Sequence, residues 1–462
     1  MSYVFLKTSH HHLFSANHAL VIVMHHSALE GTLHRIWALH HLAANTPMDL
    51  TLHVAFHAPI SLLVAGTHYC STTDKTYRRH IFCVSSSSVF KVAKPDMVSA
   101  INRTGGIVGL PTHHATLPAP DVEAVWIDGT QHLVTAELEV WASVSKVEPE
   151  RIPGYWYGRK GTPPMPAIPV PSGQRVFFFL HGGGYIQLSA HPNDMTSSIT
   201  RNLVELDDST THALALEYRL STAAPLRDEN PFPAALLDAL AGYNYLVNGM
   251  GYSPSNIIVV GDSAGGNLAL ALMRYLVEHK NSPNVSLPAP PGHLILLSPW
   301  VDLTTSHDWP GSSSTSNTAD YLGSQNSGRS LYCKRAFLGP FGLGFAFSNP
   351  YISPASLFLP DAQAHFGGFP RTFLATGTAE RLYDSARTLR KKMAADMGEG
   401  IGKGQITYFE GKDAVHDFLV FTWHPCRPAA LKAIQQWLTT VEPHVTTLCT
   451  IPNGHSDSLN PL

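Results

Sequence analysis

One segment, residues 257–267, limits what this chain can fold into more than any other. It reads Ile-Ile-Val-Val-Gly-Asp-Ser-Ala-Gly-Gly-Asn, and a helix-forming run follows it. Apolar, mostly β-branched residues that lead into Gly-x-Ser-x-Gly predict a buried strand, a sharp turn and a helix, with Ser263 at the tip of the turn. Gly261 and Gly265 are expected there because a Cβ at either position would collide with the neighbouring strand or helix. The helix N-terminus behind Ser263 would place partial positive charge where an oxyanion forms.

A second glycine motif follows another buried strand. The run Val-Phe-Phe-Phe-Leu at 176–180 is followed at once by His-Gly-Gly-Gly-Tyr at 181–185. Consecutive glycines leave their N–H groups uncovered and let the chain approach a ligand closely. We expect the N–H groups of Gly183, Gly184 and Ala264 to hold a carbonyl oxygen as it becomes an oxyanion. Phosphate binding is disfavoured because no lysine follows the glycines at Walker spacing.

These two motifs together resemble the hormone-sensitive-lipase-like branch of the α/β-hydrolase fold family, in the form found in fungal esterases and lipases. The resemblance runs from about residue 110 to about residue 440. The family carries a serine, an acid and a histidine in that chain order, so the resemblance implies Ser263 as the nucleophile. Further family-like segments lie at 217–220 (Glu-Tyr-Arg-Leu), 232–238, 298–302 and 349–354.

The chain contains 27 histidines, so position along the chain has to identify the catalytic one. His416 follows a strand-like run at 406–409 and a short loop, and it stands two residues before Phe418. A histidine in this place, after the last strand, is where the resemblance implies the general base. His424 is the alternative, but Pro425 follows it and its spacing fits poorly.

The acid of the triad has two candidates. A buried-strand run at 372–376 is followed by Gly377 and then by the segment from Glu380 to Asp384. The family pattern places the acid at Glu380, although most relatives have aspartate there. A glutamate reaches the same imidazole nitrogen if the loop shifts slightly. Asp384 is the alternative, in which case Glu380 would only cap the following helix. The pattern favours Glu380.

Strand-like and helical segments alternate along the region of resemblance. This alternation predicts a mainly parallel sheet with helices on both faces. With the resemblance, it predicts an α/β-hydrolase fold with an eight-stranded sheet and a small helical cap. The candidate catalytic residues then all follow strand ends, where open α/β sheets bind ligands. The expected strands are 122–127, 176–180, 213–217, 257–261, 293–297, 372–376 and 406–409, and the expected helices are 195–206, 234–248, 265–278, 382–396 and 429–440.

Three regions are expected along the chain. They are a histidine-rich N-terminal extension, an α/β-hydrolase catalytic domain and a polar tail, at 1–105, 106–442 and 443–462. In the catalytic domain we expect cap elements at about 130–165 and a flexible loop, rich in serine, glycine and asparagine, at 311–330. Thirteen histidines fall within the first 80 residues. No His-x3-His pair on a convincing helix has a carboxylate partner there, so no metal site is expected.

Composition narrows the classes of function. Apolar residues make up 44% and charged residues 14% of the chain, so it can bury a large core. A net charge of −3 without a basic block argues against a nucleic-acid partner. The five cysteines form no CxxC pair, which argues against a disulfide framework and a zinc knuckle. No segment reaches the ~20 apolar residues of a membrane span or resembles a signal peptide. A cytoplasmic location is therefore expected, with membrane contact and oligomeric state left open.

The expected function is hydrolysis of a small-molecule carboxylic ester through an acyl-enzyme on Ser263, without a metal or organic cofactor. Tyr185 and Phe418 are expected to line the acyl pocket. Two alternatives stay open. One is an amidase or a deacetylase of an acetylated sterol or secondary metabolite, which would share all of this machinery and differ in pocket shape. The other is a non-catalytic small-molecule binder on the same scaffold, although such proteins usually lose the serine or the histidine.

Overall fold

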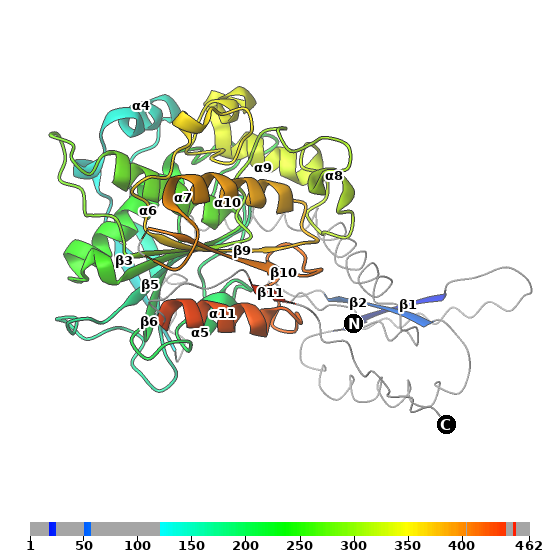
Figure 1. The fold of residues 1–462 in the computed structure, drawn as a ribbon, viewed down its shortest axis with the longest axis horizontal. Helices are drawn as coiled ribbons and strands as arrows, with labels where there is room; N and C mark the ends of the chain where they lie inside the picture. Colours follow the sequence, from blue (N-terminus) through cyan, green and yellow to red (C-terminus); the bar gives the residue numbers. More distant parts are fainter. Residues whose placement is uncertain (1–17, 25–49, 57–120, 403, 440–446, 450–462) are drawn as a thin grey trace, which may run out of the picture. The chain divides into compact units, whose positions relative to one another are not determined.

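The computed structural model describes residues 18–24, 50–56, 121–402, 404–439 and 447–449 (Figure 1). The chain divides into two units, Met1–Ser99 and Ala100–Leu462. In the first unit, strands β1 (His18–Met24) and β2 (Leu50–Phe56) pair in parallel. Most of the histidine-rich extension, for which no metal site was expected, lies outside the described residues.

The second unit is built on one large sheet. Its strand order is β11-β10-β9-β8-β7-β5-β6-β4-β3. The strands from β5 to β11 pair in parallel, while β4 runs antiparallel to both of its neighbours, β3 and β6. The strands β3 to β10 give the predicted mainly parallel sheet of eight, and the short β11 adds a ninth. Their bounds are β3 Val122–Ile127, β4 Ile152–Gly158, β5 Val176–Leu180, β6 His212–Leu216, β7 Ile257–Asp262, β8 His293–Leu297, β9 Arg371–Gly377, β10 Ile406–Gly411 and β11 Thr447–Cys449.

Strand β4 lies where cap elements were expected, and it is instead an inner strand of the sheet. Its sequence, Ile-Pro-Gly-Tyr-Trp-Tyr-Gly, contains the residues that usually mark loops. Every residue of β4 is buried. Trp156 packs into the core on one face of the sheet, and Tyr155 and Tyr157 pack into the core on the other. Burial on both faces therefore outweighs the proline and glycine signals.

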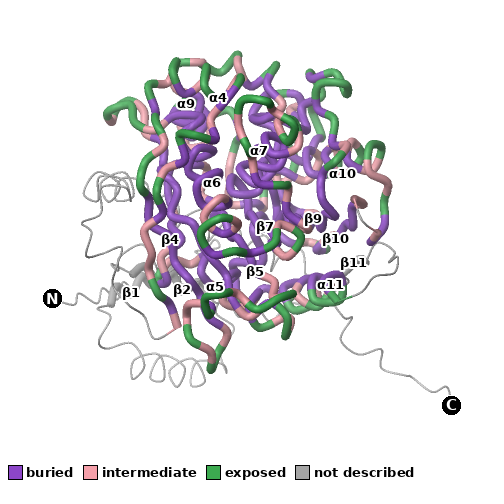
Figure 2. Tube along the Cα trace, turned by 90° about the vertical axis from the view of Figure 1, so that its left-hand side faces the viewer, coloured by how far each residue is buried: buried purple, intermediate pink, exposed green. Residues whose placement is uncertain are grey.

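Helices cover both faces of the sheet, as predicted. Figure 1 shows α6, α7 and α10 on one side and α5 and α11 on the other, and Figure 2 shows the buried residues running along the strands between them. Each face has its own hydrophobic core. The helix bounds are α5 Ser197–Leu203, α6 Ala234–Asn244, α7 Ala264–Glu278, α10 Tyr383–Met397 and α11 Arg427–Thr439, with a π-helical turn, η4, at Tyr245–Gly249.

Shorter elements gather on the side of α6 and α7. Helix α4 (Ala136–Ser145) places Trp141 against Phe232 and Tyr351, with ring centroids 5.1 and 5.0 Å apart. Among the described residues, no helix has the length and apolar character that crossing a bilayer requires. The remaining bounds are α8 Ser313–Ser316, α9 Gly328–Leu338, η3 Gln131–Leu133, η5 Pro254–Asn256, η6 Gly339–Phe341, η7 Leu343–Phe347 and η8 Asp361–Gln363.

The segment 311–330, expected to be a flexible loop, is hydrogen-bonded to residues at and just before the start of α10, and its flexibility stays a prediction. The backbone N–H of Ser313 donates to Asp384 Oδ2 at 2.7 Å, and Asn317 Nδ2 donates to the carbonyl of Glu380 at 2.7 Å. Short polar side chains bond readily to nearby backbone groups, so a composition typical of loops also suits a tethered segment.

Candidate active site

The turn after β7 has the geometry that the sequence predicted. Ser263 has φ 51° and ψ −116°, a backbone conformation that few residues other than glycine adopt. A Cβ on Gly261 would lie 2.2 Å from the carbonyl oxygen of Gly265, and a Cβ on Gly265 would lie 1.9 Å from that of Leu180 in β5. Only glycine fits at either position, which confirms that prediction. The N–H of Ser263 donates to Leu297 O at 2.9 Å and so fixes the turn to the end of β8.

A serine, a histidine and a glutamate meet at the carboxyl edge of the sheet. His416 Nε2 lies 2.8 Å from Ser263 Oγ, and His416 Nδ1 lies 3.2 Å from Glu380 Oε2. The three residues follow β7, β10 and β9, respectively. All are buried, with exposed fractions of 7% for Ser263, 1% for His416 and 0% for Glu380. The arrangement is that of a nucleophile, a base and an acid that orients the base.

The alternative residues lie elsewhere. The carboxylate of Asp384 accepts a hydrogen bond from the backbone of Ser313. His424 Nδ1 accepts from the N–H of Cys426 at 3.2 Å, and its ring packs 5.4 Å from that of Phe418. Among the residues that the structure describes, neither side chain hydrogen-bonds to Ser263, His416 or Glu380.

The second oxygen of Glu380 is held as firmly as the first. Oε1 accepts a hydrogen bond from Ser298 Oγ at 2.6 Å and another from the backbone N–H of Gly377. Burial raises the pKa of Glu380, and the hydrogen bond and charge of His416 act in the opposite direction. Both oxygens are therefore fixed, which orients the imidazole ring.

A second carboxylate, which sequence reasoning missed, also contacts the histidine. Asp417 Oδ2 lies 3.0 Å from His416 Nε2. Burial opposes protonation of His416, but the charges and hydrogen bonds of Asp417 and Glu380 outweigh it and hold the pKa of His416 well above its usual 6.5. The only sequence signal for Asp417 is its position directly after the histidine.

The segment 311–330, called the tethered segment below, supplies a third buried carboxylate near His416. Asp320 Oδ1 accepts from the backbone N–H of His416 at 3.4 Å, and Oδ2 accepts from that of Arg381 at 2.7 Å. The ring of Tyr321 lies 5.9 Å from the ring of His416. No spacing or motif singled out this pair, because the segment lacks the hydrophobic period of a helix or a strand.

The glycine loop after β5 lies directly against the nucleophile. The N–H of Gly182 donates to Asp262 Oδ1 at 3.0 Å, and a Cβ on Gly182 would lie 3.1 Å from that of Ser263. Gly183 and Gly184 have φ values of 110° and 63°. Within 121–402, where this loop is described, their N–H groups have no acceptor from the protein. That these two N–H groups and that of Ala264, the first residue of α7, hold an oxyanion stays a prediction.

Two buried ionisable residues support this loop in their neutral forms. Burial lowers the pKa of His181 to about 4 and raises the pKa of Glu217 to about 8. His181 Nδ1 lies 2.7 Å from Gly182 O, and its ring stacks on Tyr218 at 4.2 Å. Glu217 Oε2 accepts from Ser189 Oγ at 2.5 Å. The glycine loop therefore packs against His181 and Tyr218, and the imidazole of His181 is neutral there.

The two residues expected at the acyl pocket are both fully buried. Tyr185 donates to Asn267 Oδ1 at 2.7 Å and stacks on Phe337 with ring centroids 3.8 Å apart. Phe418 belongs to the core on the α11 face, with its ring 6.5 Å from that of Phe409. Their packing partners are other protein side chains.

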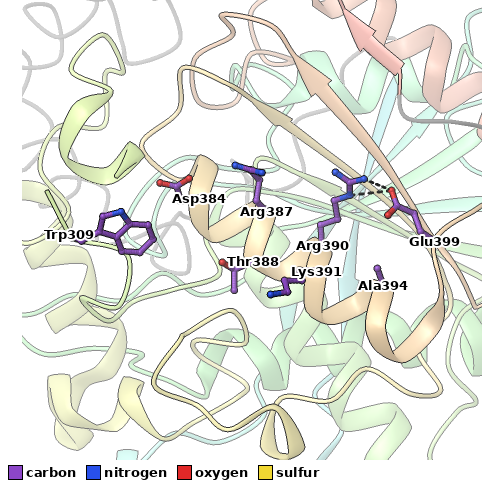
Figure 3. A pocket seen from close by; sticks show the side chains of 8 residues that line it. All are labelled: Trp309, Asp384, Arg387, Thr388, Arg390, Lys391, Ala394 and Glu399. Carbon is purple, nitrogen blue, oxygen red and sulfur yellow. Dashed lines mark hydrogen bonds and ion pairs between the residues drawn. The ribbon is translucent and has the colours of Figure 1, made fainter. Parts of the chain in front are cut away.

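Two further features lie away from the triad. A surface cavity of about 450 Å³ opens beside α10, as Figure 3 shows, and none of its lining residues belongs to the serine site. Glu137, Glu278 and His279 place their ligand-type atoms within 4.8 Å of one another, the one such group of at least three among the described residues. His279 Nε2 lies 2.9 Å from Glu137 Oε1, so this group links α4 to the end of α7.

Comparison with known proteins bears on the family and the fold of this chain. Residues 177–420 match a family described as alpha/beta hydrolase fold. An acetyl-hydrolase of Streptomyces hygroscopicus is 29% identical over 316 residues, which cover 65% of this chain and 91% of that protein. An esterase of Acinetobacter venetianus is 27% identical over 275 residues, covering 59% and 77%. The crystal structure of EstE7, a hormone-sensitive-lipase homologue from a metagenome library, superposes on this chain with a TM-score of 0.51 and 23% identity. The match covers 80% of this chain and 99% of that one, and it supports the fold alone.

Proposed function

This chain belongs to the α/β-hydrolase fold family. We propose that it is a carboxylesterase-type hydrolase of the hormone-sensitive-lipase-like branch, which its two glycine motifs resemble. We propose that it cleaves small-molecule carboxylic esters through an acyl-enzyme on Ser263. The observation that carries this proposal is the 2.8 Å contact between Ser263 Oγ and His416 Nε2, with Glu380 3.2 Å from the opposite nitrogen. A serine hydroxyl is a weak nucleophile until an adjacent base takes its proton.

Acylation begins when His416 takes the proton of Ser263 and Oγ attacks the ester carbonyl carbon. The negative charge that develops on the carbonyl oxygen is stabilised by the N–H groups of Gly183, Gly184 and Ala264. Glu380 holds the imidazolium that has formed. His416 then protonates the leaving alcohol as the C–O bond breaks, and the acyl group stays on Ser263.

Deacylation repeats the same steps with water. His416 takes a proton from the water, whose oxygen attacks the acyl carbon, and the oxyanion forms again beside the glycine loop. Collapse of this intermediate returns the proton to Ser263 Oγ and releases the carboxylic acid. Each step uses side chains and backbone groups of this chain, and none calls on a metal or an organic cofactor.

The acyl group that we propose is short. The Streptomyces relative is an acetyl-hydrolase, and it is matched over most of its length. An amidase or a deacetylase would use the same residues, because protonation of a leaving amine by His416 needs no further group. Pocket shape and the leaving group distinguish these reactions.

The test is hydrolysis of p-nitrophenyl esters from acetate to palmitate by the wild-type protein and by Ser263→Ala. We expect turnover that is highest for the short acyl chains and that falls by about 10³-fold or more in the variant. A folded wild-type protein that cleaves none of these esters, or an equally active Ser263→Ala protein, would overturn the proposal. Parallel assays with p-nitroanilide substrates would reveal an amidase.

A further inference from the structure

One nitrogen of His416 faces two groups at once. Nε2 lies 2.8 Å from Ser263 Oγ and 3.0 Å from Asp417 Oδ2. An imidazole nitrogen carries either a hydrogen or a lone pair. It therefore cannot accept a hydrogen bond from the serine hydroxyl and also bind an ionised carboxylate favourably.

The protonation state of His416 decides between these partners. In the neutral ring, Nδ1–H donates to Glu380 and the lone pair of Nε2 accepts from Ser263, which is the state that can act as a base. In the imidazolium, Nε2–H donates to Asp417 while Nδ1–H donates to Glu380. The second state pairs the ring with two carboxylates, and charge-assisted hydrogen bonds of this kind are the strong ones.

The backbone around Asp417 directs its side chain toward the ring. Asp417 has φ 49°, in the left-handed region, and its N–H donates to Ser298 Oγ at 3.2 Å. Ser298 Oγ donates in turn to Glu380 Oε1 at 2.6 Å, so one hydroxyl links the backbone of Asp417 to the carboxylate of Glu380. Asp417 is 7% exposed, and its Oδ1 has no hydrogen-bond partner within the described ranges. The carboxylate thus has few alternatives to His416 in the substrate-free protein.

The other carboxylates near the imidazole ring of His416 form no hydrogen bond to its nitrogens among the described residues. Asp320 binds the backbone N–H of His416, and the ring of Tyr321 lies beside the imidazole. Asp262, from the end of β7, accepts from Gly182, and burial together with the charge of Asp417 raises the pKa of Asp262 well above its usual range. Glu380 and Asp417 are therefore the two carboxylates that touch the ring itself.

We propose that Asp417 is a positioning residue that holds His416 as an imidazolium paired with two carboxylates in the free protein. His416 then becomes a base only after Nε2 loses its proton and can accept a hydrogen bond from Ser263. This inference rests on the proposed role of His416. The acid limb of activity, where activity falls as pH falls, is then set by Asp417 as well as by Glu380. In the tetrahedral intermediate, the same carboxylate stabilises the imidazolium that serine deprotonation creates.

The test replaces Asp417 by asparagine, which tolerates the left-handed backbone and keeps the N–H that binds Ser298. Loss of an adjacent opposite charge lowers the pKa of a histidine by about 1–2 units, so we expect the acid limb of kcat/KM for p-nitrophenyl acetate to move about 1–2 pH units lower. The weaker base lowers the rate on the alkaline plateau by about three- to tenfold.

A second readout does not require ester turnover. The rate at which diethyl p-nitrophenyl phosphate inactivates the protein reports the nucleophilicity of Ser263, and its acid limb should move in Asp417→Asn by the same amount. If the wild type cleaves no ester but its inactivation shows this shift, the proposed function fails and the role of Asp417 stands. If neither profile shifts, Asp417 does not hold His416, and the inference is overturned.

Two further variants guard the interpretation. Glu410→Gln removes a carboxylate from β10 that accepts from Tyr383 at 3.1 Å and does not touch the ring, so its acid limb should match the wild type. An equal shift in Glu410→Gln would mean a general charge effect and would contradict the inference. Asp417→Gly, which also suits a positive φ, replaces Asp417→Asn if that variant does not fold, and the same shift is expected.

Discussion

The two sides of the active site are built by different means. On the sheet side, the turn after β7 requires glycines, since a Cβ on Gly265 would lie 1.9 Å from Leu180 O. On the other side, the segment 311–330 reaches the triad through side chains such as Asp320, which accepts from the backbone of His416 and of Arg381. Close backbone packing admits only glycine and therefore leaves a motif in the sequence. Polar tethers can be made by many residue types and leave none.

The largest effect should come from breaking the backbone contact on the sheet side. In Gly265→Ala, the new methyl group meets the carbonyl oxygen of Leu180 in β5, which cannot move without the sheet, and that of His181 directly after it. We expect a loss of more than about 4 kcal/mol in the free energy of unfolding, measured by urea denaturation, and no detectable ester hydrolysis. Gly344→Ala is the matched control, because a Cβ there would meet nothing within 4 Å. Equal stability of the two variants would contradict the role given to backbone packing.

The next largest effect concerns the acid, for which the loop after β9 and the first turn of α10 offer rival carboxylates, Glu380 and Asp384. Glu380→Gln removes the charge that holds the imidazolium, and we expect kcat/KM for p-nitrophenyl acetate to fall by about 10³- to 10⁴-fold with the fold retained. Asp384→Asn, which weakens only a bond to Ser313, should stay within about threefold of the wild type. A larger loss in Asp384→Asn than in Glu380→Gln would reverse the assignment.

The smallest effect should come from the tethered segment itself. Asp320→Asn keeps the shape of the side chain but turns an amide toward one of the two backbone N–H groups. We expect a loss of about 1–3 kcal/mol in the free energy of unfolding and about a tenfold fall in kcat/KM. Ser316→Ala, at an exposed position of the same segment, removes local hydrogen bonds to Ser312 O and Gly311 O and should change stability by less than about 0.5 kcal/mol. An Asp320→Asn protein as stable and active as Ser316→Ala would show that the segment does not support the triad.

Much of the fold follows from the sequence because hydrophobic runs and glycine turns carry it. Strands β3, β5 and β8 begin and end at the predicted residues. Strand β4, in a stretch where cap elements were expected, escaped prediction because its burial on both faces depends on neighbours that are distant in the chain. Local pattern does not report such tertiary contacts.

The residues of the candidate site likewise fall into those that the sequence nominates and those that it does not. Ser263, His416 and the glycine loop stand at strand ends in a recognisable order, so the sequence is enough to nominate them. The role of Asp320 depends on the direction of its side chain, and that of Asp417 also on a backbone with positive φ. Neither property has a sequence signal of its own.

The most direct measurement is the mass of the protein after reaction with diethyl p-nitrophenyl phosphate, followed by peptide mapping. A single adduct on the peptide that contains Ser263 is expected, formed by the wild type and absent from Ser263→Ala. The rate of labelling should fall by about 10³-fold or more when His416 is replaced by alanine. No adduct on the folded wild-type protein, or an adduct on another residue, would contradict the assignment of Ser263 as an activated nucleophile.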